Sequence, residues 1–122
     1  MRAWLLLIAY VVALVVASAS AGQVSQAMRP RWLQAIVYRQ FTPAGSWAVR
    51  KAYCIVGRES QWHARAISPT GDYGLFQWNY ATWHRVLDWS RILDPVYNTW
   101  AAWHISRHGT DWSPWAGGRY PC

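Results

Sequence analysis

The sequence predicts a mainly α-helical domain whose functional region is a loop or very short hairpin set between helices. Three observations lead to this prediction. Apolar residues recur at helical spacing in several segments. The stretch 61–78 between two of those segments is neither helical in pattern nor long enough for ordinary strands. The chain of 122 residues suits one small domain, and no internal repeat divides it.

The N-terminal residues have the pattern of an export signal. Arg2 precedes an apolar run over 3–17, and small residues at A-x-A spacing follow it. Cleavage after Ala19 or Ala21 fits this pattern, so we assign 1–21 to a signal peptide. An uncleaved membrane anchor is the alternative, although the run is short for a full span. A cleaved signal would place the protein outside the cytoplasm, in the periplasm or cell wall.

Residues that typically begin or end helices predict the first two helices. Residues 22–30 form a polar, flexible leader, and Pro30 suits the first turn of a helix that extends to about Gln40. Ser46 is then expected to cap a second helix, which ends near Ser60.

Two further helices are expected after the loop. Asn79 or Thr82 can cap a helix over 83–87, and Asp94-Pro95 begins another that Gly109 stops. Together with the first two, these helices make 31–122 a single domain of four helices around one loop-rich cleft.

Charge and composition indicate which kinds of molecule this chain can bind. The net charge of +7 and pI near 10.0 suit anionic cell-wall polymers, and a membrane would matter only if the N-terminal segment stays uncleaved. Basic residues are scattered and no nucleic-acid-binding motif is present, so nucleic acid is not expected as a partner. His104 and His108 are four residues apart without a glutamate between them, so neither a metal site nor a cofactor is expected.

The two cysteines are Cys54, in the second predicted helix, and Cys122, the last residue. An even count in an exported protein favours one disulfide, which would fasten the C-terminal tail to that helix. Two free thiols are the alternative.

Glu59 is the only glutamate, and the chain holds just five acidic residues in all. It ends the second predicted helix, is followed by Ser60 as a possible hydrogen-bond partner, and is faced by the loop 71–77. A carboxyl group on a rigid element among apolar neighbours can act as a general acid, because burial raises its pKa. An ordinary solvated charge is the alternative. Asp72 and Asp88 are the candidates for a second carboxylate, and a turn aspartate is normally structural.

Other polar and aromatic residues lie close to this region in the sequence. The amide of Gln77 suits sugar hydroxyl and acetamido groups. Most of the 11 tryptophans should be structural, but a few can form platforms under sugar rings. The predicted substrate-binding residues besides Gln77 are Ser60, Trp62, Tyr73, Trp78, Tyr97 and Asn98.

An ordered series of motifs resembles the lysozyme-like superfamily, above all the soluble lytic transglycosylases of bacteria and phages. The series consists of Glu59-Ser60, Ala66-Ile67-Ser68-Pro69, Gly71-x-x-Gly74-Leu75-Phe76-Gln77, Thr82-Trp83 and Asp94-Pro95-x-Tyr97-Asn98. The segment 74–79 also resembles goose-type and related lysozymes, and the likeness covers roughly 47–115.

The resemblance implies a lysozyme-like α+β fold and a specific reaction. In that family a glutamate, here Glu59, is the sole acid and base that cleaves the β-1,4 bond between N-acetylmuramic acid and N-acetylglucosamine in peptidoglycan. The sugar's own 6-hydroxyl then attacks and gives a 1,6-anhydro product. The family's glutamine corresponds to Gln77 and its tyrosine to Tyr97. This chain departs from the family pattern at Asp72-Tyr73 and Thr99-Trp100.

Two other functions remain open from the sequence. A hydrolytic muramidase would use a second carboxylate and leave a reducing end. A non-catalytic, cationic wall-binding module would use the basic charge without turnover.

Overall fold

The computed structural model describes residues 29–119 and 122. The predicted signal peptide and all of the predicted leader except Arg29 and Pro30 lie outside the described residues. The chain divides into two units, 1–30 and Arg31–Cys122, and the second contains all of the described helices and strands. Within the described segments, no helix is both long and apolar enough to cross a membrane.

Helix α2 (Arg31–Phe41) and helix α3 (Ser46–Glu59) are joined by the short 3-10 helix η1 (Thr42–Ala44). Pro43 lies in this connection, where its missing N–H costs no helical hydrogen bond. The residue before α3 is Gly45, with φ of 92°, and it occupies the cap position predicted for Ser46. That prediction was wrong by one residue, because the reversal at this corner needs a positive φ, which glycine adopts without strain.

Each helix buries one face. In α2, Leu33, Val37 and Phe41 recur every four residues and are buried. In α3 the buried stripe includes Ala52 and Ile55. Helix α2 packs against both α3 and α5 (Pro95–Ile105), so these three helices surround the core.

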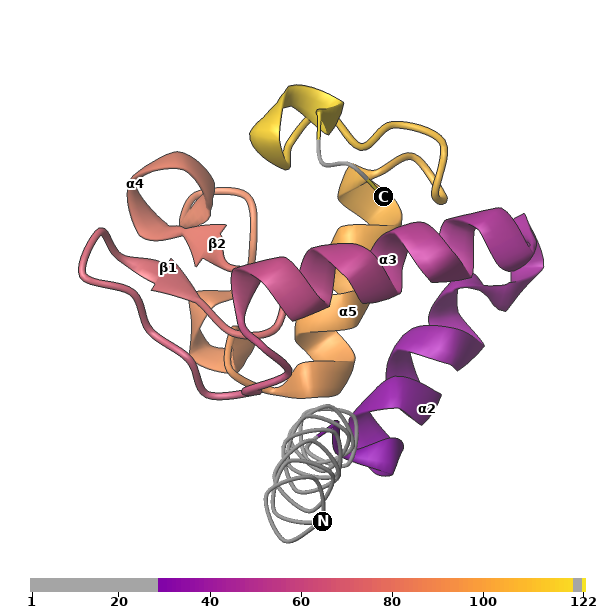
Figure 1. Cartoon of the computed structure of the whole chain (residues 1–122). Helices are drawn as coiled ribbons and strands as arrows, with labels where there is room; N and C mark the ends of the chain where they lie inside the picture. Colours follow the sequence, from indigo (N-terminus) through magenta and orange to yellow (C-terminus); the bar gives the residue numbers. More distant parts are fainter. Residues whose placement is uncertain (1–28, 120–121) are drawn as a thin grey trace, which may run out of the picture. The chain divides into compact units, whose positions relative to one another are not determined.

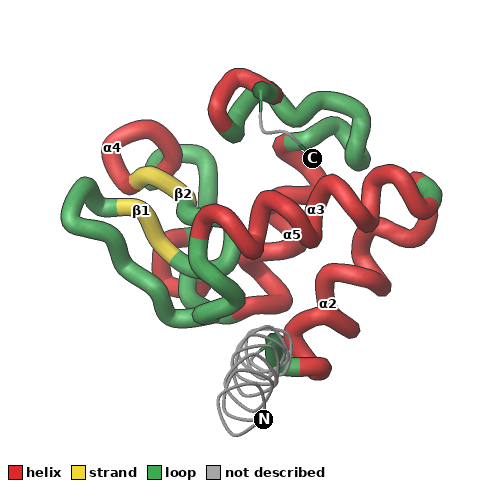
Figure 2. The backbone as a smooth tube through the Cα atoms, in the orientation of Figure 1, coloured by secondary structure: helices red, strands yellow, loops and turns green. Residues whose placement is uncertain are grey.

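The stretch between α3 and α5 contains a very short hairpin, as predicted. Strand β1 (Asp72–Tyr73) pairs antiparallel with β2 (Trp78–Asn79), with Asp72 opposite Asn79 and Tyr73 opposite Trp78. Ile67 makes an isolated bridge to Tyr73. Figure 2 shows these two strands inside a long loop region.

Side-chain caps begin the later helices. In α4 (Tyr80–Trp83), Asn79 accepts from the N–H of Thr82 at 3.2 Å, which confirms the cap predicted there. Asp94 caps α5 by accepting from the N–H of Val96 at 3.0 Å.

The predicted helix over 83–87 is wrong in its bounds, because α4 ends at Trp83 and residues 84–86 form a turn. The N–H of Val86 bonds to Trp83 O at 2.9 Å, a three-residue turn, and Asp88 then caps the 3-10 helix η2 (Trp89–Arg91). Because Asp88 caps η2, the chain forms a second short turn and α4 does not continue.

The C-terminal tail closes over the core. Trp112 and Trp115 are buried, and the tail contains the 3-10 helix η3 (Ala116–Gly118). A disulfide joins Cys54 in α3 to Cys122, with Cα atoms 5.9 Å apart, which confirms the predicted pairing. Figure 1 shows the described C-terminal residue close to α3. The tail is therefore tied covalently to the helix that ends in Glu59.

Breaking this disulfide should destabilise the domain. The bond closes a loop with a sequence separation of 68 residues. We expect Cys122→Ser to lower the free energy of unfolding by about 3 kcal/mol, chiefly because the unfolded chain regains entropy. Urea denaturation measures the loss. Cys54→Ser with Cys122→Ser is the control and should lose no more than the single variant. An unchanged unfolding midpoint would contradict the stabilising role.

Candidate functional site

Glu59 is the last residue of α3, and its side chain is half-buried. The next residue, Ser60, ends the helix: its N–H donates to Val56 O at 3.1 Å and its Oγ–H donates to the same oxygen at 3.2 Å. Ser60 is buried, so the predicted substrate contact through its hydroxyl is not supported. It finishes the helix and fixes where Glu59 stands.

The chain turns sharply directly after Ser60. Gln61 and Trp62 have φ of 51° and 64°, the left-handed region that side chains other than glycine seldom adopt. Such residues cost of the order of 1–3 kcal/mol each, and they cluster at functional sites. The Trp62 ring is 4% exposed and meets the ring of Tyr53 edge-on at 5.1 Å. Trp62 therefore packs under α3, and its predicted place as a sugar platform is not supported.

The loop that follows is fastened by Gln77. Its Nε2 donates to Gly74 O at 2.9 Å and to Ala66 O at 3.2 Å, and the N–H of Gly74 donates to the same Ala66 oxygen at 2.8 Å. Both amide hydrogens are thus used inside the loop. The half-buried side chain retains Oε1 as the atom that can accept a hydrogen bond from a sugar hydroxyl.

Asp72 forms the polar centre of the hairpin. Its Oδ2 accepts from the hydroxyls of Ser68 and Thr70, each at 2.5 Å, and its Oδ1 accepts from Asn79 Nδ2 at 2.9 Å. Burial raises the pKa of Asp72, but the hydrogen bonds from Ser68, Thr70 and Asn79 together hold that pKa below its usual value. The carboxyl group is consequently ionised at neutral pH.

Asn98 lies in the core, although the sequence placed it among the substrate contacts. It is fully buried, its Oδ1 accepts from the N–H of Phe76 at 2.9 Å, and its Nδ2 donates to Tyr73 O at 3.1 Å and Ile92 O at 2.8 Å. All three side-chain bonds stay within the protein, so substrate contact is not supported. Gly74 must lack a side chain, because a Cβ there would lie 2.1 Å from Asn98 Nδ2.

Tyr97 and Trp78 are also enclosed. The Tyr97 hydroxyl accepts from the N–H of Asp88 at 2.7 Å, and the residue is 7% exposed. The hydroxyl thus binds the loop before α5. Trp78 is 1% exposed, and its Nε1 donates to Asn98 O at 3.2 Å. Neither position supports the predicted contact with substrate, whereas Tyr73 is half-buried and lines a cavity.

One aromatic contact was not foreseen from the sequence. Trp115 in the tail donates from Nε1 to Phe76 O at 2.9 Å, and its ring packs 5.2 Å from that of Trp78. The loop 74–79 is therefore held from two sides, by Asn98 and by the tail. Nothing in the irregular sequence around Trp115 indicated this partner, 39 residues away.

Two cavities adjoin the loop that follows α3. One, of about 570 Å³, begins at Ser60 and His63 and extends to the exposed side chains of Trp32 and Ile67. The other, of about 560 Å³, lies between that loop and η2 and contains Tyr73. Glu59 lines neither of these two cavities. The next residue in the chain, Ser60, lines the first one.

Comparison with protein families supplies the wider context. The family described as "Lysozyme like domain" matches residues 45–117, which is more than half of the chain. Searches of curated proteins and of solved structures gave no significant match. The matched segment includes α3, the hairpin and α5. The match supports a role in cleaving cell-wall glycans in general, and with the disulfide it suggests a place outside the cytoplasm.

Asp72 should make the stability of the domain depend on pH. A carboxyl whose folded pKa is depressed stabilises the fold above its unfolded pKa of about 3.9, and that contribution is lost as the pH falls toward the lower folded value. We expect Asp72→Asn to cost about 1 kcal/mol at pH 7 and to flatten the decline in stability between pH 5 and pH 3.

Urea denaturation at pH 7, pH 5 and pH 3 measures the free energy of unfolding of each protein. Thr70→Ala is the matched control, because it removes one hydrogen bond to Asp72 and leaves the carboxylate. It should give a smaller loss and keep the decline. Identical pH dependence in the wild type and Asp72→Asn would reject the assignment.

Proposed function

We propose that this chain, which belongs to the lysozyme-like domain family, is a lytic transglycosylase that cleaves the β-1,4 bond between N-acetylmuramic acid and N-acetylglucosamine in peptidoglycan. One observation carries the proposal: the matched segment encloses the chain's only glutamate, half-buried at the end of a rigid helix. The anionic wall polymers around that substrate suit a chain of net charge +7.

In the proposed reaction Glu59 acts twice. As the acid, it gives its proton to the glycosidic oxygen while the bond to the sugar carbon breaks. As the carboxylate, it then takes the proton of the 6-hydroxyl, whose oxygen attacks the same carbon and closes the 1,6-anhydro ring. The proton lent in the first step returns in the second, so no water is consumed.

The surroundings of Glu59 favour a fixed carboxyl group. Cys54 lies in the same helix, and its disulfide restrains the helix from the tail. The positive φ of Gln61 and Trp62 prevents α3 from continuing beyond Ser60. Rigid support of this kind keeps a catalytic group within the tolerance that proton transfer requires.

We assign different tasks to the other predicted site residues. Gln77 can accept a hydrogen bond from the substrate through Oε1, and Tyr73 offers a half-buried ring. Ser60, Trp62 and Trp78 support the loop and helix end from within the core. Tyr97 and Asn98 have the same supporting task at the start of α5. These five are positioning residues in the proposal.

A second candidate, the hydrolytic muramidase, is favoured by one observation at Asp72. A hydrolase with two carboxylates needs one that stays protonated as the acid and one that stays ionised. The depressed pKa of Asp72 suits the ionised partner. Its two oxygens already accept three side-chain hydrogen bonds, however, so it is poorly placed to act as a nucleophile. We therefore rank transglycosylation first.

Export is part of the proposal. A cleaved signal over 1–21, a leader to residue 30 and a wall-acting domain over 31–122 would bring the enzyme to its substrate and permit the disulfide to form. An uncleaved segment would instead hold the domain at a membrane surface.

Removal of the acid should abolish turnover without removing binding. We expect Glu59→Gln to reduce lysis of purified sacculi by about 10²–10⁴-fold, because the amide has no proton to give at the glycosidic oxygen. Binding to sacculi in a pelleting assay should persist. Asp111→Asn is the matched control, since it neutralises a carboxylate in the tail and should leave lysis unchanged. Lysis that survives Glu59→Gln would leave the wall-binding module as the better explanation.

The products separate the two enzymatic candidates. Mass spectrometry of digested sacculi should find 1,6-anhydro ends, and Asp72→Asn should keep that product while slowing the reaction by no more than about tenfold. Reducing ends that disappear in Asp72→Asn would support the hydrolase instead.

A further inference from the structure

The hairpin presents different chemistry on its two faces. Successive side chains of a strand point to opposite sides, so Asp72 and Tyr73 in β1 diverge. Asp72 bonds to Ser68, Thr70 and Asn79 on one side. On the other side, the ring of Tyr73 meets that of Trp89 edge-on at 5.1 Å.

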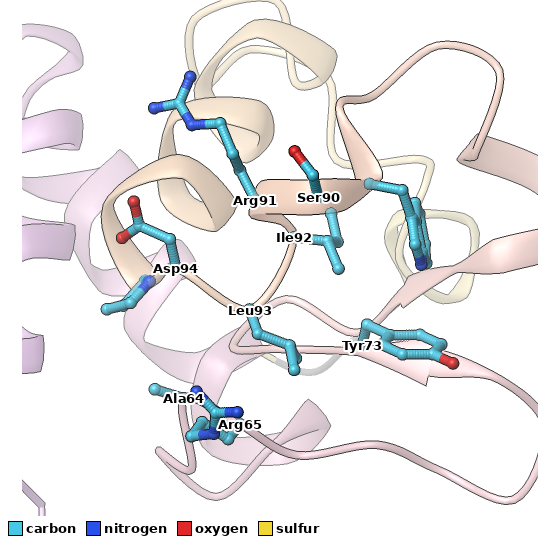
Figure 3. A pocket seen from close by; sticks show the side chains of 10 residues that line it. Ala64, Arg65, Tyr73, Ser90, Arg91, Ile92, Leu93 and Asp94 are labelled. Atoms are coloured by element: carbon cyan, nitrogen blue, oxygen red, sulfur yellow. The ribbon is translucent and has the colours of Figure 1, made fainter.

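The Tyr73 face borders a cavity of about 560 Å³, a size typical of ligand pockets. Neither Glu59 nor Asp72 lines it. Figure 3 shows Tyr73 on one side of this space, Ile92 and Leu93 between the hairpin and η2, and Ala64 with Arg65 on the far side. The cavity thus lies where the loop after α3 faces the segment 89–95. Of its lining residues, only Tyr73 is also proposed to contact the glycan.

The walls are apolar and the rim is cationic. Leu93, Ala64 and Pro95 supply small aliphatic surface beside the two aromatic rings. Two exposed arginines, Arg65 and Arg91, stand at the rim against one carboxylate, Asp94, whose Oδ1 already accepts from the N–H of Val96. The rim therefore carries a net positive charge.

The guanidinium groups of Arg65 and Arg91 differ in the contacts that they make within the protein. The guanidinium of Arg91 lies 4.6 Å above the ring of Tyr97 and, in Figure 3, points away from Tyr73. The exposed side chain of Arg65 lies on the side of this cavity where Ala64 and Leu93 form the wall, and Arg65 and Ala64 also line the neighbouring cavity beside Ser60. A guanidinium binds a carboxylate through two parallel hydrogen bonds, so Arg65 is the better anchor for an anion.

We propose that this cavity binds a short peptide that ends in a free carboxylate and carries small apolar side chains. The carboxylate pairs with Arg65, the methyl groups lie against Leu93 and Ala64, and the backbone packs beside the Tyr73–Trp89 ring pair. The origin of the peptide rests on the proposed function. If peptidoglycan is the substrate, the peptide is one of the alanine-ending stems that branch from its glycan strands. A stem of a neighbouring strand would then hold the enzyme on the wall during cleavage.

Binding is measured without turnover, on the Glu59→Gln protein, by calorimetric titration with N-acetyl-D-alanyl-D-alanine. We expect saturable binding with a Kd of about 1 mM or tighter. The C-terminal amide of the same dipeptide should bind at least fivefold more weakly, because it lacks the carboxylate. No saturation at ten times that concentration would overturn the proposal.

Variants of the arginines test the site itself. Arg65→Gln should weaken binding at least fivefold, and Arg65→Lys should be intermediate, since it keeps the charge without the paired hydrogen bonds. Arg85→Gln is the matched control, because Arg85 is exposed and lies outside the lining. An equal effect of Arg65→Gln and Arg85→Gln would show general charge attraction and reject the site.

Activity assays separate this inference from the proposed function. With Glu59 intact, Arg65→Gln should slow cleavage of peptide-bearing sacculi severalfold and leave cleavage of glycan strands stripped of peptides unchanged. Cleavage of both substrates without any Arg65 effect would reject the peptide site alone. Failure of the wild type to cleave either substrate would reject the proposed function while the binding titration still decides the site.

Discussion

The buried amide of Asn98 is the constraint on which the loop region depends. It binds the backbone of Phe76, Tyr73 and Ile92, three points that are not adjacent in the chain, from one position at the start of α5. A fully buried amide that lost any of these bonds would cost about one to three kcal/mol, so the hairpin and the η2 segment are fixed together. Glycine at 74 is required by the same contact, since no Cβ fits beside the amide.

Because of these hydrogen bonds, a hairpin with only two residues in each strand is held in a fixed position. Such a short pair would be unstable alone, but here side chains rather than strand length secure it. Asp72 binds the loop before β1 through Ser68 and Thr70, and Gln77, in the turn between the strands, binds the backbone of Ala66. One face of the hairpin carries the hydrogen bonds of Asp72, and the other carries the ring pair of Tyr73 and Trp89.

The second structural theme is restraint of α3 at its functional end. The disulfide at Cys54 holds the tail against the helix, and Trp115 of that tail donates to Phe76 in the loop. The tail therefore links the helix that bears Glu59 to the turn between β1 and β2. Since the structure places Trp62 beneath the same helix, aromatic packing substitutes for the long strands and wide core that a chain of this size lacks.

The sequence alone determined the elements whose causes are local: helical periodicity in α2 and α3, the Asp94-Pro95 start of α5, the cap at Asn79, and the family to which the motifs belong. It also predicted the disulfide, since two cysteines permit one pairing. Only the tertiary structure decided which motif residues face inward. Asn98 and Trp78 carry polar groups that suit a sugar equally well, yet their partners lie about 20 residues away. Long-range hydrogen bonds of this kind have no periodicity and leave no local pattern, so burial had to be seen in the fold.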